Sequence, residues 1–298
     1  MCAPCRKWAD ARVCPYGSNV IPTHLKRYVP ILLALVAGFW FALGTAMAAP
    51  PAESFRLVPG VNSLFGMETG YIWLSGSALI PAGGRPGSGT LVNISDQLGV
   101  DQGEATVAIL KSVILRSHVL NLDVLMFSPN AVRKVRNAFV FHNKTYEEGT
   151  SVETKLDFTW IRLGYGYRVP VLSGLTVAPG MGVHYIRHGI TLNAETKRSE
   201  FVSNSRQLDG TYPVIGLETR YQFPLGFDLS LELEGIHLVT RGYLILSAFT
   251  VSWQAHPDVV LSLGCSDRTV RYLETHQPLN NEWSYNMLGF TAGIAFTF

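Results

Sequence analysis

The sequence predicts an all-β protein: a closed antiparallel transmembrane β-barrel of about ten strands, with eight as the alternative, preceded by a signal peptide. Three observations predict this fold. Only 15% of the 298 residues are charged while 47% are hydrophobic, whereas soluble domains carry about 25% charged residues. Hydrophobic residues recur with a period of two through most of the chain beyond residue 64. The spacers between these stretches alternate between short and long, as in transmembrane β-barrels.

A leader precedes the barrel. Its apolar run, residues 28–43, follows Lys26 and Arg27 and is followed by the small-residue site Ala46-Met47-Ala48. This order of features predicts a secretory signal peptide that is cleaved after Ala48. An uncleaved membrane anchor is the alternative, but the run is short for the about 20 residues that a spanning helix needs. We therefore expect an N-terminal extension and signal peptide over 1–48, a short periplasmic segment over 49–64 and the barrel over 65–298.

The net charge and the cysteine content exclude two further features, a nucleic-acid partner and a stabilising disulfide. The net charge of +2 is too small to indicate a nucleic-acid partner. Cys265 is the single cysteine beyond residue 48, so an intramolecular disulfide cannot hold the exported chain together. Strand pairing and closure must do so instead.

The alternation defines the strands. In residues 227–234, FDLSLELE, every odd position is apolar and every even position is polar. Ten stretches of this kind lie at 65–76, 104–115, 117–128, 152–169, 174–189, 211–223, 226–237, 242–254, 257–271 and 283–298. An even number brings both ends of the barrel to one side of the membrane. The spacers at 116–117, 169–173, 224–225 and 255–256 are tight, and those at 77–103, 129–151, 190–210 and 272–282 are long. The spacer at 238–241 is the one short member of the long class.

The charged face of these strands is predicted to line the lumen. Its charges have opposed signs and can pair with one another and with water, while the apolar face meets lipid. A barrel of this size has little interior space, so a salt-bridged plug or a narrow path is expected. In 152–169 the alternation slips at Trp160-Ile161, which we interpret as a β-bulge. The candidate lumen charges are Glu68, Asp123, Glu153, Lys155, Asp157, Arg162, Glu218, Arg220, Asp228, Glu232 and Glu234.

Glycines concentrate in one hairpin. With its turn centred near Leu172, Gly164 would lie opposite Gly180, and Gly182 would lie opposite Arg162. Glycines there are expected to bend strands or to leave room for a bulky neighbour.

His184 is predicted to project into the lumen near these glycines. A lone histidine among carboxylates is more typical of a hydrogen-bonded network than of a metal site. We predict no metal and no cofactor.

The end of the chain carries the most specific signal. From residue 288 every even position is apolar, and the last residue is Phe298. This resembles the C-terminal signal of bacterial outer-membrane proteins, which the barrel-assembly machinery recognises, with Phe290, Ile294, Phe296 and Phe298 as its residues. The chain beyond the leader resembles the small outer-membrane barrels of the OmpA and OmpW type. The resemblance implies a bacterial outer-membrane location and contact with outer-membrane lipid.

Some small barrels are enzymes. Omptin-like proteases also have ten strands and use acidic and histidine groups near the outer rim. The candidates in this chain are His188, Glu234, His237, Asp267 and His276. Glu234 and His237 are three residues apart, and a period of two places them on opposite faces. We therefore predict that the protein is not an enzyme.

The most direct functional hypothesis is a structural or surface-interaction protein with a plugged lumen. Loops are where binding surfaces usually lie, so an extracellular ligand would meet the long loops 77–103, 129–151 and 190–210. A narrow channel for small molecules is the first alternative. An outer-membrane hydrolase is the second.

Overall fold

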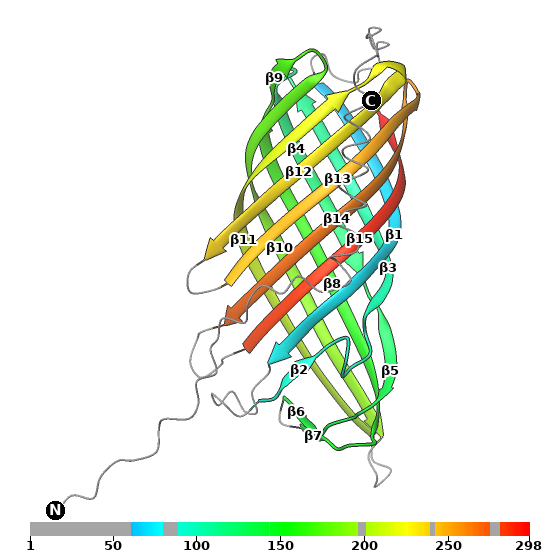
Figure 1. Ribbon diagram of the computed structural model, residues 1–298, viewed down its shortest axis with the longest axis vertical. Coiled ribbons are helices and arrows are strands. Elements are labelled where there is room, and N and C mark those ends of the chain that lie inside the picture. Colours follow the sequence, from blue (N-terminus) through cyan, green and yellow to red (C-terminus); the bar gives the residue numbers. More distant parts are fainter. Residues whose placement is uncertain (1–60, 80–88, 143, 196–200, 239–241, 275–280) are drawn as a thin grey trace, which may run out of the picture. The chain divides into compact units, whose positions relative to one another are not determined.

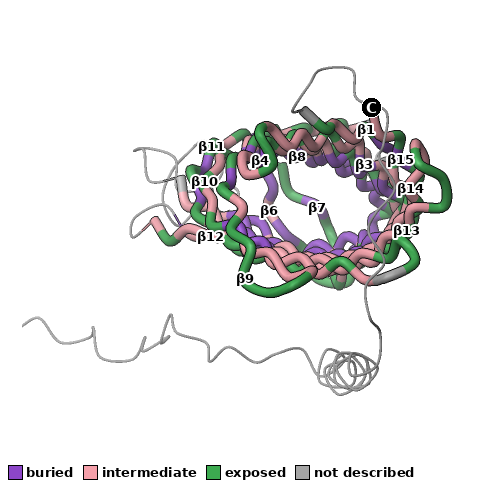
Figure 2. Tube along the Cα trace, turned by 90° about the horizontal axis from the view of Figure 1, so that it is seen from above, coloured by how far each residue is buried: buried purple, intermediate pink, exposed green. Residues whose placement is uncertain are grey.

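The fold is a single closed ring of antiparallel strands. The computed structural model describes residues 61–79, 89–142, 144–195, 201–238, 242–274 and 281–298, so the predicted leader lies outside the described residues. Each strand of the ring pairs with its neighbours, and β1 pairs with β15 to close it (Figure 1, Figure 2). The described ring consists of β1 (Val61–Leu79), β3 (Gln102–Ile114), β4 (His118–Phe127), β8 (Ser151–Tyr167), β10 (Leu175–Glu195), β11 (Phe201–Gln222), β12 (Phe227–Leu238), β13 (Gly242–His256), β14 (Val259–Glu274) and β15 (Asn281–Thr297). The prediction of ten strands is confirmed, although the first strand begins at Val61 and not at residue 65.

Short turns join the strands at the end that carries the C terminus (Figure 1). One is the 3-10 turn η2 (Pro224–Gly226), and another follows β9 (Val169–Leu172). Leu172 pairs with Leu175, so the second turn is centred on Ser173-Gly174, where Gly174 has a φ of 78°. A positive φ is readily adopted only by glycine.

The position of that turn corrects the predicted register. The sequence pattern placed the turn about one residue too early, which shifts every cross-strand pair by two. Gly164 lies opposite Gly182, and Arg162 lies opposite His184. The true register brings a cation and a histidine side by side on one face of the sheet.

The opposite end carries the predicted long loops, and these contain short strands: β2 (Leu91–Asn93), β5 (Asn130–Lys134), β6 (Phe139–Phe141) and β7 (Lys144–Tyr146). The predicted loop 190–210 is mostly strand, because β10 and β11 remain paired up to Glu195 and Phe201. The hairpin formed by β6 and β7 lies across the ring when the barrel is viewed along its length (Figure 2).

These loops are packed rather than freely presented. Ile94, Leu98, Phe139 and Phe141 are each at most 2% exposed and belong to the hydrophobic core. Burial also raises the pKa of Tyr146 to about 12, so this phenol stays neutral at physiological pH. The loops therefore close the outer part of the barrel with apolar side chains.

A belt of exposed hydrophobic side chains surrounds the barrel. Every strand of the ring contributes at least one, and Trp73 makes edge contacts with Tyr71 and Phe290 at its margin. Water cannot solvate such a surface favourably, whereas lipid can. Among the described residues no helix is long and apolar enough to cross a membrane. The belt includes Phe65, Leu110, Leu122, Leu163, Met181, Ile215, Leu231, Ile245, Leu263 and Phe290.

The belt ends at one level of the β-ladder. Ile161 pairs with Tyr185 on the outer surface, and the next outward pair is Thr159 with Arg187, which pairs in turn with Asp209. The outer surface thus changes from apolar to polar within two residues. We take this level as the outer surface of the membrane.

The inner surface changes at the same level but in the opposite sense. Arg162 and His184 form the last polar inward pair. The next inward pairs, Trp160 with Ile186 and Phe158 with His188, belong to a mostly apolar, fully buried core. Within the membrane the barrel is apolar outside and charged inside, and above the membrane the arrangement is reversed.

The belt predicts a position-specific cost of adding charge. Replacing Leu231 by Arg on the outer face of β12 should destabilise the barrel by about 2–4 kcal/mol, because a cation would face hydrocarbon near its midplane. The control Leu225→Arg, in an exposed short turn, should cost less than about 1 kcal/mol. Urea unfolding of the lipid-reconstituted protein measures both, and equal costs would contradict the assigned belt.

Candidate functional site in the lumen

Arg162 is the centre of a charge layer that crosses the lumen. This side chain is buried, and it comes from β8. Its guanidinium donates to Asp123 of β4 at 2.8 Å and, across the interior, to Glu232 and Glu234 of β12, the last at 3.0 Å. Because β8 and β12 are not neighbours in the ring, these bonds span the barrel. A planar guanidinium suits such multiple carboxylate contacts better than an ammonium would.

His184 extends this layer to the apolar core. Its Nε2 lies 2.7 Å from Glu234 Oε2, and Trp160 Nε1 donates to its Nδ1 at 2.9 Å. An indole nitrogen can only donate, so His184 Nδ1 must accept and Nε2 carries the proton. Both ring nitrogens are therefore occupied. His184 serves as a structural link between the ion pairs and the aromatic core.

Two more ion pairs lie on the lumen side of the membrane segment. Lys111 of β3 contacts Glu218 of β11 at 2.5 Å, again across the interior, and Arg220 contacts Asp228 at 2.5 Å. Glu68 accepts hydrogen bonds from Ser262 at 2.8 Å and Thr291 at 2.7 Å.

Arg268 lies near the top of this layer. Its guanidinium stacks over the Trp160 ring at 5.8 Å and donates to Ser266. Such a cation–π contact stabilises a buried cation.

The lumen assignment is wrong for three residues. Glu153, Lys155 and Asp157 alternate with buried residues of β8 and lie on its outer surface. The expected bulge at Trp160-Ile161 is absent, because β8 pairs with β10 and β4 without a shift in this region. The pattern slips because the surroundings of a regular strand change from lipid to water at that level. An apolar residue faces outward below it and inward above it.

The other eight predicted charges lie on the lumen side: Glu68, Asp123, Arg162, Glu218, Arg220, Asp228, Glu232 and Glu234. Sequence reasoning missed Lys111 and Arg268. Both share the parity of inward neighbours on their strands, Val107 for Lys111 and Val270 for Arg268. That parity was the signal that could have found them.

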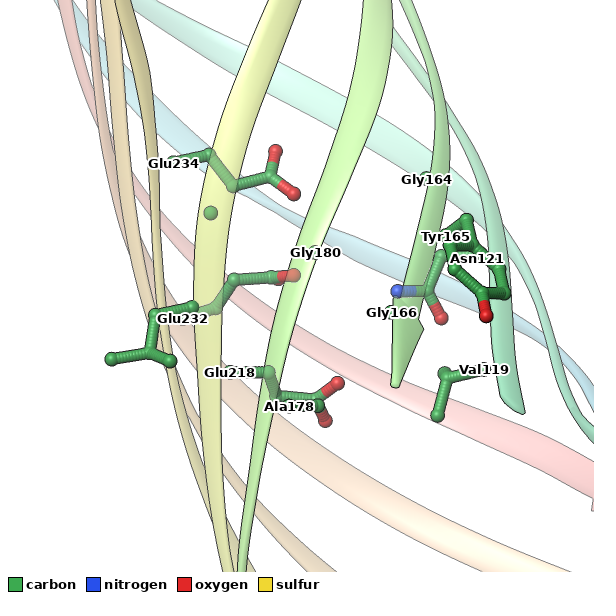
Figure 3. A pocket seen from close by; sticks show the side chains of 12 residues that line it. Val119, Asn121, Gly164, Tyr165, Gly166, Ala178, Gly180, Glu218, Glu232 and Glu234 are labelled. Atoms are coloured by element: carbon green, nitrogen blue, oxygen red, sulfur yellow. The ribbon is translucent and has the colours of Figure 1, made fainter. Parts of the chain in front are cut away.

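A pocket opens below the charge layer (Figure 3). It encloses about 300 Å³ of empty space, part of it open to solvent, and its walls carry the carboxylates of Glu218, Glu232 and Glu234. Gly164 and Gly166 form the facing wall, and a Cβ added to either would meet its nearest neighbour only at ordinary contact distance. These two glycines leave space that the chain could have filled.

A second layer, made of ring side chains, crosses the interior above the charge layer. Phe158, His188, Trp283 and Tyr285 contact one another through their rings and are each at most 5% exposed. Neither ring nitrogen of His188 has a hydrogen-bond partner. The barrel interior therefore carries a charged layer within the membrane and an aromatic layer above it.

The residues considered for proteolysis do not come together in one site. His188 and Glu234 point inward, whereas Asp267 lies on the outer surface, hydrogen bonded to Asn286. His237 lies on the outer face of β12 against Tyr243, and His276 lies outside the described residues. Within the described ranges no group of His, Cys, Asp and Glu side chains has the arrangement of a metal site.

The fold and lumen define a transmembrane β-barrel of the bacterial outer-membrane type. The chain is similar to the outer-membrane protease OmpT from Escherichia coli, with 11% identity and a TM-score of 0.54 over 83% of this chain and 99% of that one. At this identity the likeness shows the fold alone. No protein-family model and no curated protein matches the sequence.

Two further solved structures are more distant. Ail of Yersinia pestis, in complex with a heparin analogue, has 7% identity and a TM-score of 0.30, covering 79% of this chain and 99% of that one. The toluene transporter TodX of Pseudomonas putida has 9% identity and a TM-score of 0.31, covering 81% and 91%.

The central role of Arg162 predicts a large cost for its removal. Arg162→Gln leaves three lumen carboxylates without their common cation and should destabilise the barrel by about 3–5 kcal/mol. Lys155→Gln is the matched control, since Lys155 lies on the same strand in an exposed pair with Glu153, and should cost less than about 1 kcal/mol. Urea unfolding compares them. Similar losses would show that the layer does not stabilise the lumen.

The pocket wall predicts opposite responses to two glycine substitutions. Gly164→Ala should leave stability unchanged or raise it by up to about 1 kcal/mol, because it fills space and favours extended backbone. Gly180→Ala should lower it by about 1–3 kcal/mol, since its Cβ would lie 2.6 Å from the Tyr165 carbonyl oxygen. Unfolding midpoints check both, and an equal response would contradict the pocket geometry.

Proposed function

We propose that this protein is a non-conducting barrel of the bacterial outer membrane. We further propose that the part of β8, β10 and β11 above the membrane, called the outer extension, is an interaction surface. The observation that supports this proposal is that two layers of contacting side chains cross the lumen. The Arg162 layer crosses it within the membrane, and the ring cluster of Phe158, His188, Trp283 and Tyr285 crosses it above. A path for solutes would have to open both.

The part above the membrane supports a role outside the cell. β8, β10 and β11 extend well beyond the ends of β12 and β13 (Figure 1). Their outer surface carries polar side chains in a continuous network, such as Arg187 with Gln207 at 2.8 Å and Asn193 with Glu153 at 2.9 Å. Strands that served only to cross the membrane would end at its surface.

Export and insertion complete the proposal. The side chains of Phe290, Ile294 and Phe296 are about half exposed on the outer face of β15, where an assembly factor could reach them before insertion. We propose that the barrel-assembly machinery recognises this strand and that the leader over 1–48 directs export. Signal cleavage after Ala48 would be read from the N-terminal sequence of the mature protein.

Planar-bilayer recording tests the closure. The wild-type protein and the single variant Arg162→Gln should show no conductance steps, because the aromatic layer remains closed. Combining Arg162→Gln with Phe158→Ala and Tyr285→Ala should produce steps, since both layers are then opened. Heat-modifiable gel mobility confirms that each variant is folded. Steps from the wild-type protein would overturn the proposal.

A narrow cation path is the alternative that one observation favours. The lumen side chains named above include six carboxylates and four cations, and the pocket below Arg162 is lined by three of those carboxylates. Such a lumen would favour cations over anions. Wild-type steps with cation selectivity that Glu232→Gln reduces would establish this alternative.

We also infer that the protein has no hydrolytic activity of its own. The only lumen histidine in contact with a carboxylate in the described chain is His184, and its second nitrogen is occupied by Trp160. A nucleophile would need that nitrogen as its base. Turnover of peptide or lipid ester substrates by the purified barrel would contradict this inference.

A further inference from the structure

The outer half of β11 has one unpaired edge among the described strands. β11 pairs with β10 along its full length, from Phe201 to Tyr221. It pairs with β12 only from Ile215 to Gln222. Over residues 202–211 no described strand lies beside the second edge, because β12 ends at Leu238, which the same register places opposite Tyr212. Pro213, which has no N–H to donate, lies just beyond the last pair with β12.

The part of this edge over residues 202–209 lies in water, above the membrane. Ser203, Ser205, Gln207 and Asp209 point outward along it and are all exposed. Their outward neighbour Arg187 belongs to the first polar level above the belt. Lipid therefore cannot cover the edge, and its backbone groups are available to a water-borne partner.

The edge lacks several of the features that usually prevent strand addition, although Pro213 lies at its inner end and Arg206 points inward along it. Bulges, lysines and very short strands protect most natural edges. Here β10 and β11 pair without a register shift, and no lysine occurs between 202 and 214. The edge is straight and long enough for a strand of ordinary length.

The two faces beside this edge specify the partner. An added strand would place one set of side chains outward beside the polar Ser205 and Gln207. It would place the alternate set inward beside Val202, Asn204, Arg206 and Leu208, of which the first and the last are apolar. A matching segment is therefore polar on its outward side and partly apolar on its inward side.

We propose that β11 residues 202–209 bind an extended protein segment, polar on its outward side and partly apolar on its inward side, which adds to the barrel wall as an extra strand. Backbone hydrogen bonds supply the affinity, and the inward side chains supply the selection. The proposal rests on the proposed role of the outer extension as an interaction surface, and it names the class of partner.

Hydrogen exchange of the lipid-reconstituted barrel tests backbone pairing. The probe is a soluble peptide of about ten residues that alternates threonine and valine. The peptide should slow amide hydrogen exchange within residues 202–209 by about tenfold or more, and it should leave exchange in β12 and β13 unchanged. Two control peptides have the same sequence. One carries N-methyl groups on its odd-numbered amides, and the other carries them on its even-numbered amides. One of these two peptides should no longer slow hydrogen exchange, because its N–H donors toward β11 are blocked.

Cross-linking tests the position with a matched pair of cysteine variants. Ser205→Cys lies on the proposed edge, and Thr191→Cys lies directly opposite it on β10, each in a Cys265→Ser background. Strand spacing places a cysteine of an added peptide about 5 Å from position 205 and about 10 Å from position 191. A set of peptides that each replace one threonine by cysteine should form disulfides with position 205 only.

Several results would overturn the proposal. These are no protection at saturating peptide, protection by both N-methylated peptides, or equal disulfide yields at the two positions. Protection that depends on protein concentration without peptide, or a disulfide between two copies at position 205, would instead assign the edge to a second copy. Conductance recorded on the same sample separates these failures from failure of the plugged-barrel function. Mass spectrometry of the recovered peptide shows whether it is cleaved.

Discussion

The constraint on which this structure depends is that one continuous barrel wall passes from lipid into water. In lipid every backbone group must pair within the sheet, and apolar side chains must face outward. In water the same wall must turn its apolar side chains inward. Both requirements are met at one level, where Ile161 and Tyr185 end the outer apolar belt and Trp160 and Ile186 begin the inner apolar core.

The lumen follows from this constraint. Below the change of level the interior is polar, and its charges must be paired because they are shielded from bulk water. Arg162 contacts Asp123 of the neighbouring strand β4 and Glu232 and Glu234 of β12, and so joins two strands of the ring that are not neighbours. The bond from Trp160 to His184 then connects this ion-pair layer to the aromatic core above it. The two layers are therefore in direct contact although their chemistry differs.

The structure of the outer extension also follows from the passage of the barrel wall from lipid into water. Once the wall stands in water with an apolar interior, it behaves as a soluble β-structure, which needs a covered core. Loop residues such as Ile94 and Phe139 supply that cover. The loops thus have a packing role that their position in the chain does not indicate. The surface left for contact with partners is the polar wall and its uncovered β11 edge.

The sequence by itself determined the number of strands, their order and the outward face of the final strand, because a period of two and a short-long sequence of spacers are local properties. It also placed eight of the eleven proposed lumen charges. Glu153, Lys155 and Asp157 could not be placed that way, because the outward face of a strand depends on whether lipid or water surrounds it at that height. Only the tertiary structure sets that height, through the register between strands. The same register decided that His184 lies beside Arg162, and closure of the ring decided that Glu232 reaches it from the far side.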